Sequence, residues 1–240
     1  MAVRTIHLCP YNFKSSDPVV IGSEVDGGTS LSGIQDVVET SGGGYWQWSL
    51  SNGSFGGRPD ERREVALSWR AINAGLSGGA VAVFRFCDRH HQPVYGRVTV
   101  PHSDNTPFSD DTEYVSAGAA ASVLAVVNGQ VGGLNATIID IVITSERVLI
   151  GGEKFGYIGA GGWGDRVSEI SSVEDIPGGK RIRFHPPIRG GVAIGDPLDF
   201  DDPKLRMRRV SQPSSALDPL SQTTSVSSLV LIEDMRDPDL

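Results

Sequence analysis

The 240-residue chain carries 21 basic and 29 acidic residues, a formal net charge of −8, which argues against nonspecific binding to DNA or to an anionic membrane surface. Its 39% hydrophobic and 21% charged residues are typical of a folded protein and exclude wholesale disorder. The chain has 30 glycines and 14 prolines without a Gly-X-Y period, so we expect many turns and exclude a collagen helix.

The sequence predicts neither export nor a membrane span. Residues 1–7 lack the apolar core of a signal peptide, and no run of about 18 or more apolar residues is present. Cys9 and Cys87 fit no C-x-x-C spacing and form no disulfide framework. We therefore expect the protein to stay in the compartment where it is made.

The first fifty residues predict short strands. Residues 1–25 are extended in character, and a loop containing Gly27 and Gly28 follows them. Residues 34–39 predict a strand that the three glycines after Ser41 interrupt, and the aromatic segment 45–50 predicts the next strand.

Residues 59–76 predict the principal helix. Pro59 suits the first helical position, and acidic residues follow it near the positive end of the helix dipole. Helical spacing gives one apolar stripe, made of Val65, Trp69, Ile72 and Leu76. Gly78 and Gly79 end the helix, whose apolar face must cover a sheet or a neighbouring subunit.

The rest of the chain predicts further strands around one long loop. Residues 88–113 are loop-like, and Gly151-Gly152 predicts a hairpin turn between 148–150 and 154–158. Residues 211–225 predict a flexible loop or arm. Other predicted strands are 80–86, 136–144, 167–173, 180–184, 205–210 and 226–232, with 122–127 either a strand or a short helix.

Together these elements predict a mainly β protein with two β-sandwich or barrel-like units and one principal helix packed on the first. Residues 1–100 form the expected N-terminal, ring-forming unit, with 205–240 as the candidate segment for completing it. Residues 112–204 form the expected second unit, a barrel or sandwich.

Motifs for catalysis or ligand binding are weak in this sequence. Residues 159–164 match G-x-G-x-x-G, but a predicted strand follows where a phosphate-binding helix is needed, so a turn is favoured. Residues 28–33 miss the G-x-S-x-G spacing of a nucleophile elbow. A surface or packing role is favoured for each histidine: His7, His90, His91, His102 and His185.

Acidic and aromatic residues leave alternatives open. Asp104, Asp110 and Asp111 are weak candidates for a cation site, because aspartates also stabilise turns without a metal. The cluster at 199–202 would suit glycoside hydrolysis only if its carboxylates had the right separation. The segment 45–50 contains Tyr45, Trp46 and Trp48. Three alternative roles are open for these rings: stacking on sugars, filling a core or anchoring a subunit interface.

Several segments carry a family resemblance: GGYWQWSL at 43–50, LSWRAINAGLSGG at 67–79, VFRF at 83–86, and KRIRFHPPIRGGVAIGDPLDFDDPKLRMR at 180–208. Their layout resembles tail proteins of long-tailed bacteriophages and prophages, of the type found in alphaproteobacteria. The segments at 8–12 and 101–110 are also similar to that type, so the resemblance covers roughly residues 1–210.

The resemblance implies a distal tail, or baseplate, protein. Such proteins form a ring, usually a homohexamer, that joins the tail tube to the hub and receptor-binding apparatus; they are structural virion proteins with neither catalytic residues nor cofactors. It implies self-assembly, contacts with tube, hub and other tail-tip proteins, and a place at the virion tail tip after synthesis in the host cytoplasm. The candidate interface or structural residues are Tyr45, Trp46, Trp48, Trp69, Pro186, Pro187, Arg189 and Pro203.

Three alternatives stand beside this expectation. The first is a tail hub or adaptor of different symmetry. The second is a carbohydrate-binding module for host-surface glycans that uses the aromatic segment 45–50. The third is a cell-wall hydrolase that uses paired carboxylates.

Overall fold

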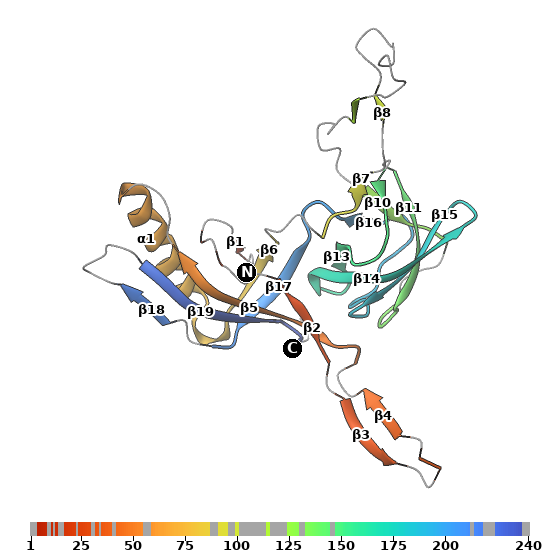
Figure 1. The fold of residues 1–240 in the computed structure, drawn as a ribbon, viewed down its shortest axis with the longest axis horizontal. Coiled ribbons are helices and arrows are strands. Elements are labelled where there is room, and N and C mark those ends of the chain that lie inside the picture. The colour runs from red at the N-terminus through yellow and green to blue at the C-terminus, as the bar shows by residue number, and fades with distance from the viewer. Residues whose placement is uncertain are drawn as a thin grey trace.

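The computed structural model describes residues 4–8, 11, 13, 17–22, 24–29, 32–33, 35–39, 42–54, 59–86, 91–95, 99–100, 114–115, 124–129, 133–144, 147–211, 214–217 and 224–236. Within these ranges the chain is mainly β, with one α-helix, an open sheet and a closed barrel. Figure 1 shows the sheet with its helix on one side and the barrel on the other. The predicted fold class is therefore confirmed.

The helix α1 spans Pro59–Gly75, which confirms the predicted element. A 3₁₀ turn at Ser77–Gly79 ends it, and Gly78 there has a φ of 67°, a conformation that glycine adopts without steric cost. Trp69 and Ile72 are buried against the sheet, as the apolar stripe predicted.

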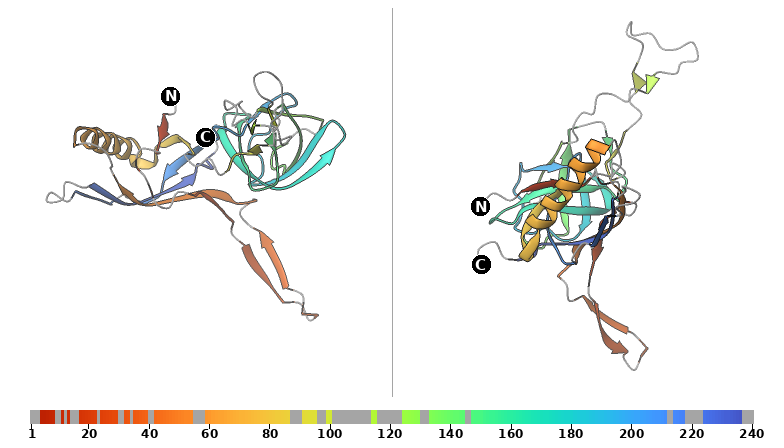
Figure 2. Two further views of the ribbon diagram at one scale, coloured as in Figure 1. Left: turned by 45° about the horizontal axis from the view of Figure 1, so that its top comes forward. Right: turned by 90° about the vertical axis from the view of Figure 1, so that its left-hand side faces the viewer.

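In the described part of the chain the open sheet has seven strands. β1 and β6 are parallel, and the other neighbours are antiparallel. α1 lies along one face of this sheet, as the two views of Figure 2 show. The order is β1 (Thr5–His7), β6 (Val81–Arg85), β17 (Lys204–Arg209), β19 (Thr224–Glu233), β5 (Tyr45–Ser54) and β2 (Val19–Ile21), with β18 (Ser214–Leu217) paired to β19.

Alternating side chains explain why these strands cover a core. In β5, Trp46, Trp48 and Leu50 are buried, whereas the residues between them are half-buried or exposed. β17 alternates in the same way, with Leu205 and Met207 inside and basic residues outside. The predicted strand at 205–210 is thus confirmed as β17, and its basic residues alternate with buried apolar ones.

The barrel closes in the order β10 (Leu124–Val127), β11 (Ile138–Ile143), β15 (Gly179–His185), β14 (Gly164–Ile176), β13 (Lys154–Gly159) and β16 (Pro197–Asp199). A bulge between Ile170 and Ser172 shifts the register of the long strand β14, and bulges bend a strand in this way at barrel corners. Phe155 packs on Phe184 and Phe200 at ring-centroid distances of 5.3 and 5.8 Å in the barrel core.

Three strand pairs lie outside the sheet and the barrel. β3 (Glu24–Thr29) pairs with β4 (Gln35–Glu39), and this hairpin projects from the body in Figures 1 and 2. β8 (Thr99–Val100) pairs with β9 (Tyr114–Val115). β7 (Val94–Tyr95) pairs with β12 (Arg147–Val148).

Three local predictions need correction. The predicted hairpin around Gly151-Gly152 is wrong, because β12 pairs with β7 while β13 pairs with β14 across the turn 159–164. The predicted loop at Gly27-Gly28 is part of β3, and β18 lies within the predicted arm 211–225. In each case strand pairing decides the local structure: β12 pairs with the distant strand β7, whereas β3 and β18 pair with the next strands along the chain, β4 and β19.

Candidate functional site

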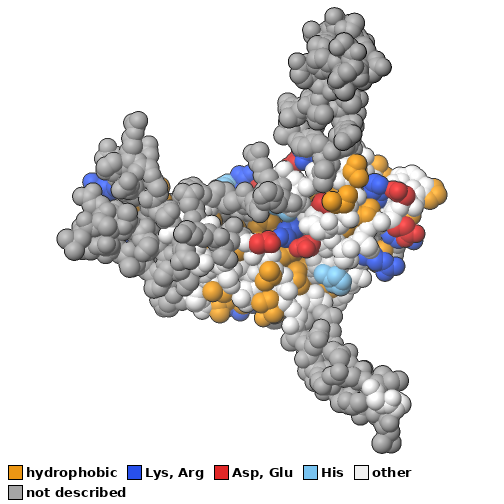
Figure 3. Space-filling view, viewed as in Figure 1, with side chains coloured by type: hydrophobic (Ala, Val, Ile, Leu, Met, Phe, Trp, Pro, Cys, Tyr) orange, Lys and Arg blue, Asp and Glu red, His pale blue; other side chains and the backbone are white. Residues whose placement is uncertain are grey.

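The sheet meets the barrel at a joint built from β5, β19, β13, β14 and the segment 186–189. Trp46 in β5 is fully buried, and its Nε1 donates a 2.7 Å hydrogen bond to the Val167 carbonyl oxygen in β14. A single side chain from the sheet thus satisfies a backbone group of the barrel wall. Figure 3 shows acidic, basic and hydrophobic side chains close together on the surface over this part of the molecule.

A buried ion pair crosses the joint beside Trp46. Arg166 Nη1 in β14 lies 2.9 Å from Glu233 Oε1 in β19, and the two side chains are 1% and 2% exposed. Glu233 Oε2 accepts a 3.2 Å hydrogen bond from the Trp46 amide, and Arg166 Nε donates to the Trp163 carbonyl oxygen at 3.0 Å. Because both charges are desolvated, each depends on the other for its compensation.

Arg189 holds a second contact between the units. Its Nη2 donates to the Gly44 carbonyl oxygen at 2.8 Å, and its Nη1 donates to Asn135 Oδ1 at 3.1 Å. Its backbone N–H donates to the Tyr157 hydroxyl oxygen at 2.9 Å. Burial raises the pKa of Tyr157 to about 12, so this hydroxyl stays protonated at neutral pH.

Two prolines bring this segment against the turn before β5. A Cβ added to Gly43, whose φ is +90°, would lie 2.2 Å from the Pro187 ring, so only glycine fits there. The Pro186 carbonyl oxygen accepts a 2.8 Å hydrogen bond from Ser168 Oγ in β14. The segment 186–189 therefore bonds to the barrel and packs closely against the sheet unit.

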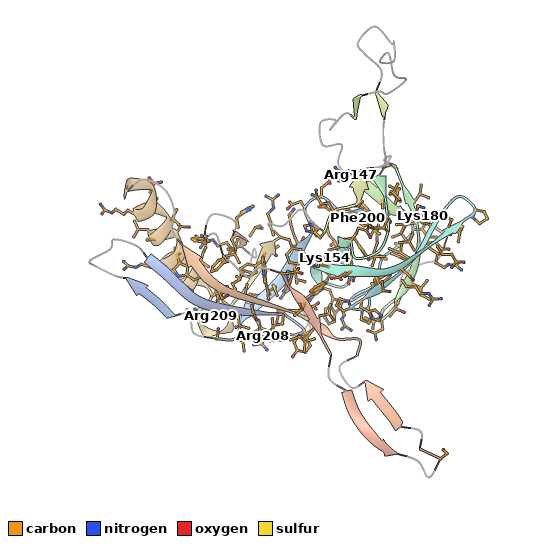
Figure 4. All side chains as sticks on the ribbon, viewed as in Figure 1. Arg147, Lys154, Lys180, Phe200, Arg208 and Arg209 are labelled. Atoms are coloured by element: carbon orange, nitrogen blue, oxygen red, sulfur yellow. The ribbon has the colours of Figure 1, made fainter. Side chains whose placement is uncertain are left out.

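Lys154 completes the joint on the barrel side (Figure 4). Its Nζ lies 2.7 Å from Asp17 Oδ1, 3.8 Å from Glu169 Oε2 and 5.5 Å from the centre of the Trp46 ring. The Lys154 side chain is only 8% exposed. Burial raises the pKa of Glu169 above its ordinary value, against the opposing attraction of Lys154.

The structure brings together only some of the residues that the sequence singled out. Trp46, Pro186, Pro187 and Arg189 meet at the joint and are buried there. Because Trp46 and Trp48 are at most 1% exposed, neither ring is open to a sugar.

The other candidates lie in the cores or beside them. Trp48 packs edge-on against Phe86 at 5.4 Å, and Trp69 packs against Tyr11 at 5.1 Å under the helix. Pro203 is buried beside Gly156, and Tyr45 is half-buried on the other face of β5.

Sequence reasoning missed Arg166, Glu233 and Lys154. Glu233 follows the apolar run 229–232, where a charge usually marks the solvent end of a strand, whereas Arg166 and Lys154 each follow an acidic residue. The only signal of these residues in the sequence is that charges of opposite sign lie in strands whose other residues alternate in polarity. Nothing in the sequence pairs residue 166 with residue 233.

The motifs that were considered for catalysis or ligand binding have structural roles where the structure describes them. Residues 159–164 turn between β13 and β14, with Gly159 opposite Gly164, as expected. His91 is buried beside the Phe86 ring. Cys9, Cys87, His90, His102 and the candidates Asp104, Asp110 and Asp111 lie outside the described residues.

The joint can hold two units rigidly, because its side chains contact one another.

No protein-family model matches this chain, and no curated protein matches it significantly. Among the described helical residues, none form a helix long and apolar enough to cross a membrane.

Proposed function

We propose that this chain is a structural protein of a bacteriophage tail tip, which forms a ring between the tail tube and the hub or receptor-binding apparatus. It acts by assembly and not by catalysis. Its partners are further copies of itself, the tube protein, the hub protein and other tail-tip proteins, and its place is the virion.

The observation that carries this proposal is the hairpin β3–β4. Within the described residues its strands pair only with each other, and the hairpin stands away from the body (Figure 1). A lone two-stranded hairpin is marginally stable in water, so contact with a second chain would stabilise it. A projecting element that contacts a different surface of the next copy gives the heterologous contact from which rings close.

The joint supports the same proposal. Segments that carry the resemblance to tail proteins are far apart in the sequence, yet Trp46 and Arg189 both lie at this joint. The buried pair between Arg166 and Glu233 fixes the sheet against the barrel. A ring component needs such rigidity, because each copy must present its contacts in one geometry for the ring to close.

The mass of the purified assembly tests the proposal. We expect the full chain to form a closed oligomer of six 25.5 kDa copies, measured by light scattering after size-exclusion chromatography. A variant with residues 24–39 replaced by a short Gly-Ser linker is expected to stay monomeric. Tryptophan emission typical of buried rings is the control that the variant still folds, since Trp46, Trp48 and Trp69 are all buried.

If the linker variant forms an oligomer of unchanged mass, the hairpin β3–β4 does not make the contact between copies. If the full chain stays monomeric at all concentrations, the proposal that it forms a ring is wrong.

A further inference from the structure

A lysine amine is held away from water where the sheet meets the barrel (Figure 4). The Lys154 side chain is only 8% exposed, and its Nζ lies 5.5 Å from the centre of the Trp46 ring, which is fully buried. Lysine amines are seldom buried, because removing their charge from water costs free energy. The joint therefore holds this nitrogen against an apolar wall, in a place that suits a neutral group better than a charged one.

Two carboxyl groups flank the nitrogen from different elements. Asp17 Oδ1, in the segment before β2, lies 2.7 Å from Nζ, and Glu169 Oε2, in β14, lies 3.8 Å from it. Glu169 stands directly opposite Lys154 in the ladder of β13 and β14. Pro18 is buried and restricts the backbone of the residue before it, which is Asp17. Strand pairing and the proline thus place the three groups relative to one another.

This geometry suits attack of the amine on the Asp17 carboxyl group. A nitrogen at hydrogen-bond distance from one carboxyl oxygen is about 3–4 Å from the carboxyl carbon, close to the separation of a near-attack conformer. Groups held in this way react with effective concentrations of up to about 10⁸ M, which offsets the cost that amide formation has in water. Condensation also removes the charge of Lys154 from a position where it is poorly solvated.

We propose that Lys154 and Asp17 join in an isopeptide bond, an amide between Lys154 Nζ and Asp17 Cγ. In this step the Nζ–Cγ bond forms and one Cγ–O bond of Asp17 breaks. The Lys154 ammonium gives up two protons, which leave with that oxygen as one water molecule. An ion pair thus becomes a neutral amide, with no oxidant or cofactor consumed. The Asp17 side chain is 72% exposed, which gives the water molecule a direct path to solvent.

Glu169 has the position of a proton carrier for this step. Its carboxyl group lies 3.8 Å from Nζ, and burial raises its pKa above the ordinary value, so it takes up a proton more readily than an exposed glutamate does. It accepts a proton from Nζ and returns it to the oxygen that leaves. Because Glu169 is regenerated, its replacement changes the rate of bond formation and not the end point.

The other described lysines lack this environment. Lys180 pairs with Asp175, and their side chains are 28% and 86% exposed. Lys204 lies 3.4 Å from Asp202 and is 38% exposed, at a cleft of about 700 Å³ between β13 and β16. The cleft is also lined by Ile158, Asp165 and Asp196. Water solvates the charges of these two lysines, so we expect the bond at Lys154 alone.

The bond closes a covalent loop from residue 17 to residue 154. Asp17 precedes β2 at one edge of the open sheet, and Lys154 begins β13 in the barrel. The isopeptide bond therefore ties the two units together in addition to the buried ion pair between Arg166 and Glu233.

Mass spectrometry of the full chain tests this proposal. Under denaturing and reducing conditions, which exclude a disulfide, we expect a mass below that of the sequence by one water molecule. Digestion with trypsin should leave residues 15–62 joined to residues 148–166, because trypsin does not cut after an acylated lysine. The peptide 167–180, which contains the exposed pair of Asp175 and Lys180, should keep its full mass.

Matched variants locate the bond. Asp17→Ala is expected to restore the full mass of the chain and to abolish the joined peptide, because it removes the carboxyl group beside Nζ. Asp175→Ala removes the acidic partner of an exposed lysine and should keep both the mass deficit and the joined peptide. Both aspartates are exposed, and tryptophan emission typical of buried rings is the control that each variant folds.

A parent chain that has the full mass of its sequence, and that trypsin cuts after Lys154, would overturn the proposal. A mass deficit that persists in Asp17→Ala would also overturn it, since the bond would then involve a different carboxyl group. The bond forms within one chain and does not depend on ring formation, so either result would leave the proposed tail function standing.

Discussion

The joint and the cleft between β13 and β16 are two regions of the same barrel wall. They differ in whether their charged side chains are buried and paired. At the joint, the Arg166–Glu233 pair is almost fully buried, and Glu233 Oε2 also accepts the Trp46 amide. At the cleft, Asp165 and Asp196 form no ion pair with a described residue, and Ile158 is 73% exposed. Satisfied buried groups indicate a contact already made inside the chain, whereas the side chains beside the cleft face solvent, and Asp196 there accepts only the Ala193 amide.

The largest effect is expected from breaking the buried pair at the joint. Glu233→Gln keeps the side-chain volume but leaves Arg166 buried without its counter-charge, so the free energy of unfolding should fall by about 3–5 kcal/mol. Asp175→Asn is the control, because Asp175 pairs with Lys180 while 86% exposed and should cost less than about 1 kcal/mol. Urea denaturation measures both, and equal losses would contradict the account of the joint.

The next effect comes from the close approach of Pro187 to Gly43. Gly43→Ala adds a methyl group that would lie 2.2 Å from the Pro187 ring, which should cost about 1–3 kcal/mol beyond the backbone strain. Gly42→Ala is the matched control, since Gly42 has a φ of +60° and nothing within 4 Å of the added carbon. Thermal denaturation compares the two variants, and a control as destabilised as Gly43→Ala would show that the Pro187 contact contributes nothing.

A smaller effect separates two tryptophans that are equally buried. Trp46→Phe removes the hydrogen bond to Val167, whereas Trp69→Phe removes an Nε1 that has no hydrogen-bond partner among the described residues. We expect Trp46→Phe to lower the free energy of unfolding by about 1–2 kcal/mol more than Trp69→Phe. Chemical denaturation of the two variants checks this order, and the reverse order would argue against a joint held by Trp46.

The smallest effect depends on pH and concerns Glu169. Because burial raises its folded-state pKa, the charged carboxylate opposes folding at neutral pH, and this cost disappears below the unfolded pKa of about 4.3. Glu169→Gln should therefore stabilise the protein by less than about 1 kcal/mol at pH 7. The gain should shrink as the pH falls through the folded pKa toward the unfolded value, and a gain that persists in acid would contradict this cause. Equilibrium unfolding at a series of pH values measures it.

The sequence predicted those parts of the fold that depend on local periodicity. The stripe through Trp69 located α1, and the aromatic segment 45–50 located β5, whose buried face the sequence left open. Strand partners that are distant in the sequence were harder to predict. The glycines at 151 and 152 favoured a hairpin, but β12 pairs with β7. Strand partners depend on tertiary packing, which a single sequence does not encode locally.

The sequence did not predict the joint itself, and of its residues it singled out only Trp46, Pro186, Pro187 and Arg189 as interface or structural candidates. Arg189 was singled out because it follows Pro186-Pro187 in the segment that resembles tail proteins. Arg166 and Glu233 carry no such sign, since each stands beside another charged residue, Asp165 or Asp234, and only the fold brings the pair within 2.9 Å. The cleft was missed because it depends on where the pairing of β13 and β16 stops.

Immunogold electron microscopy of phage particles from the host that carries this sequence tests the central claim most directly. With an antibody raised against the purified chain, the tail-tip account predicts gold at the end of the tail far from the capsid, on particles of the parent strain and not on those of a deletion strain. Label on the capsid or along the whole tail, or particles that carry no label, would contradict it.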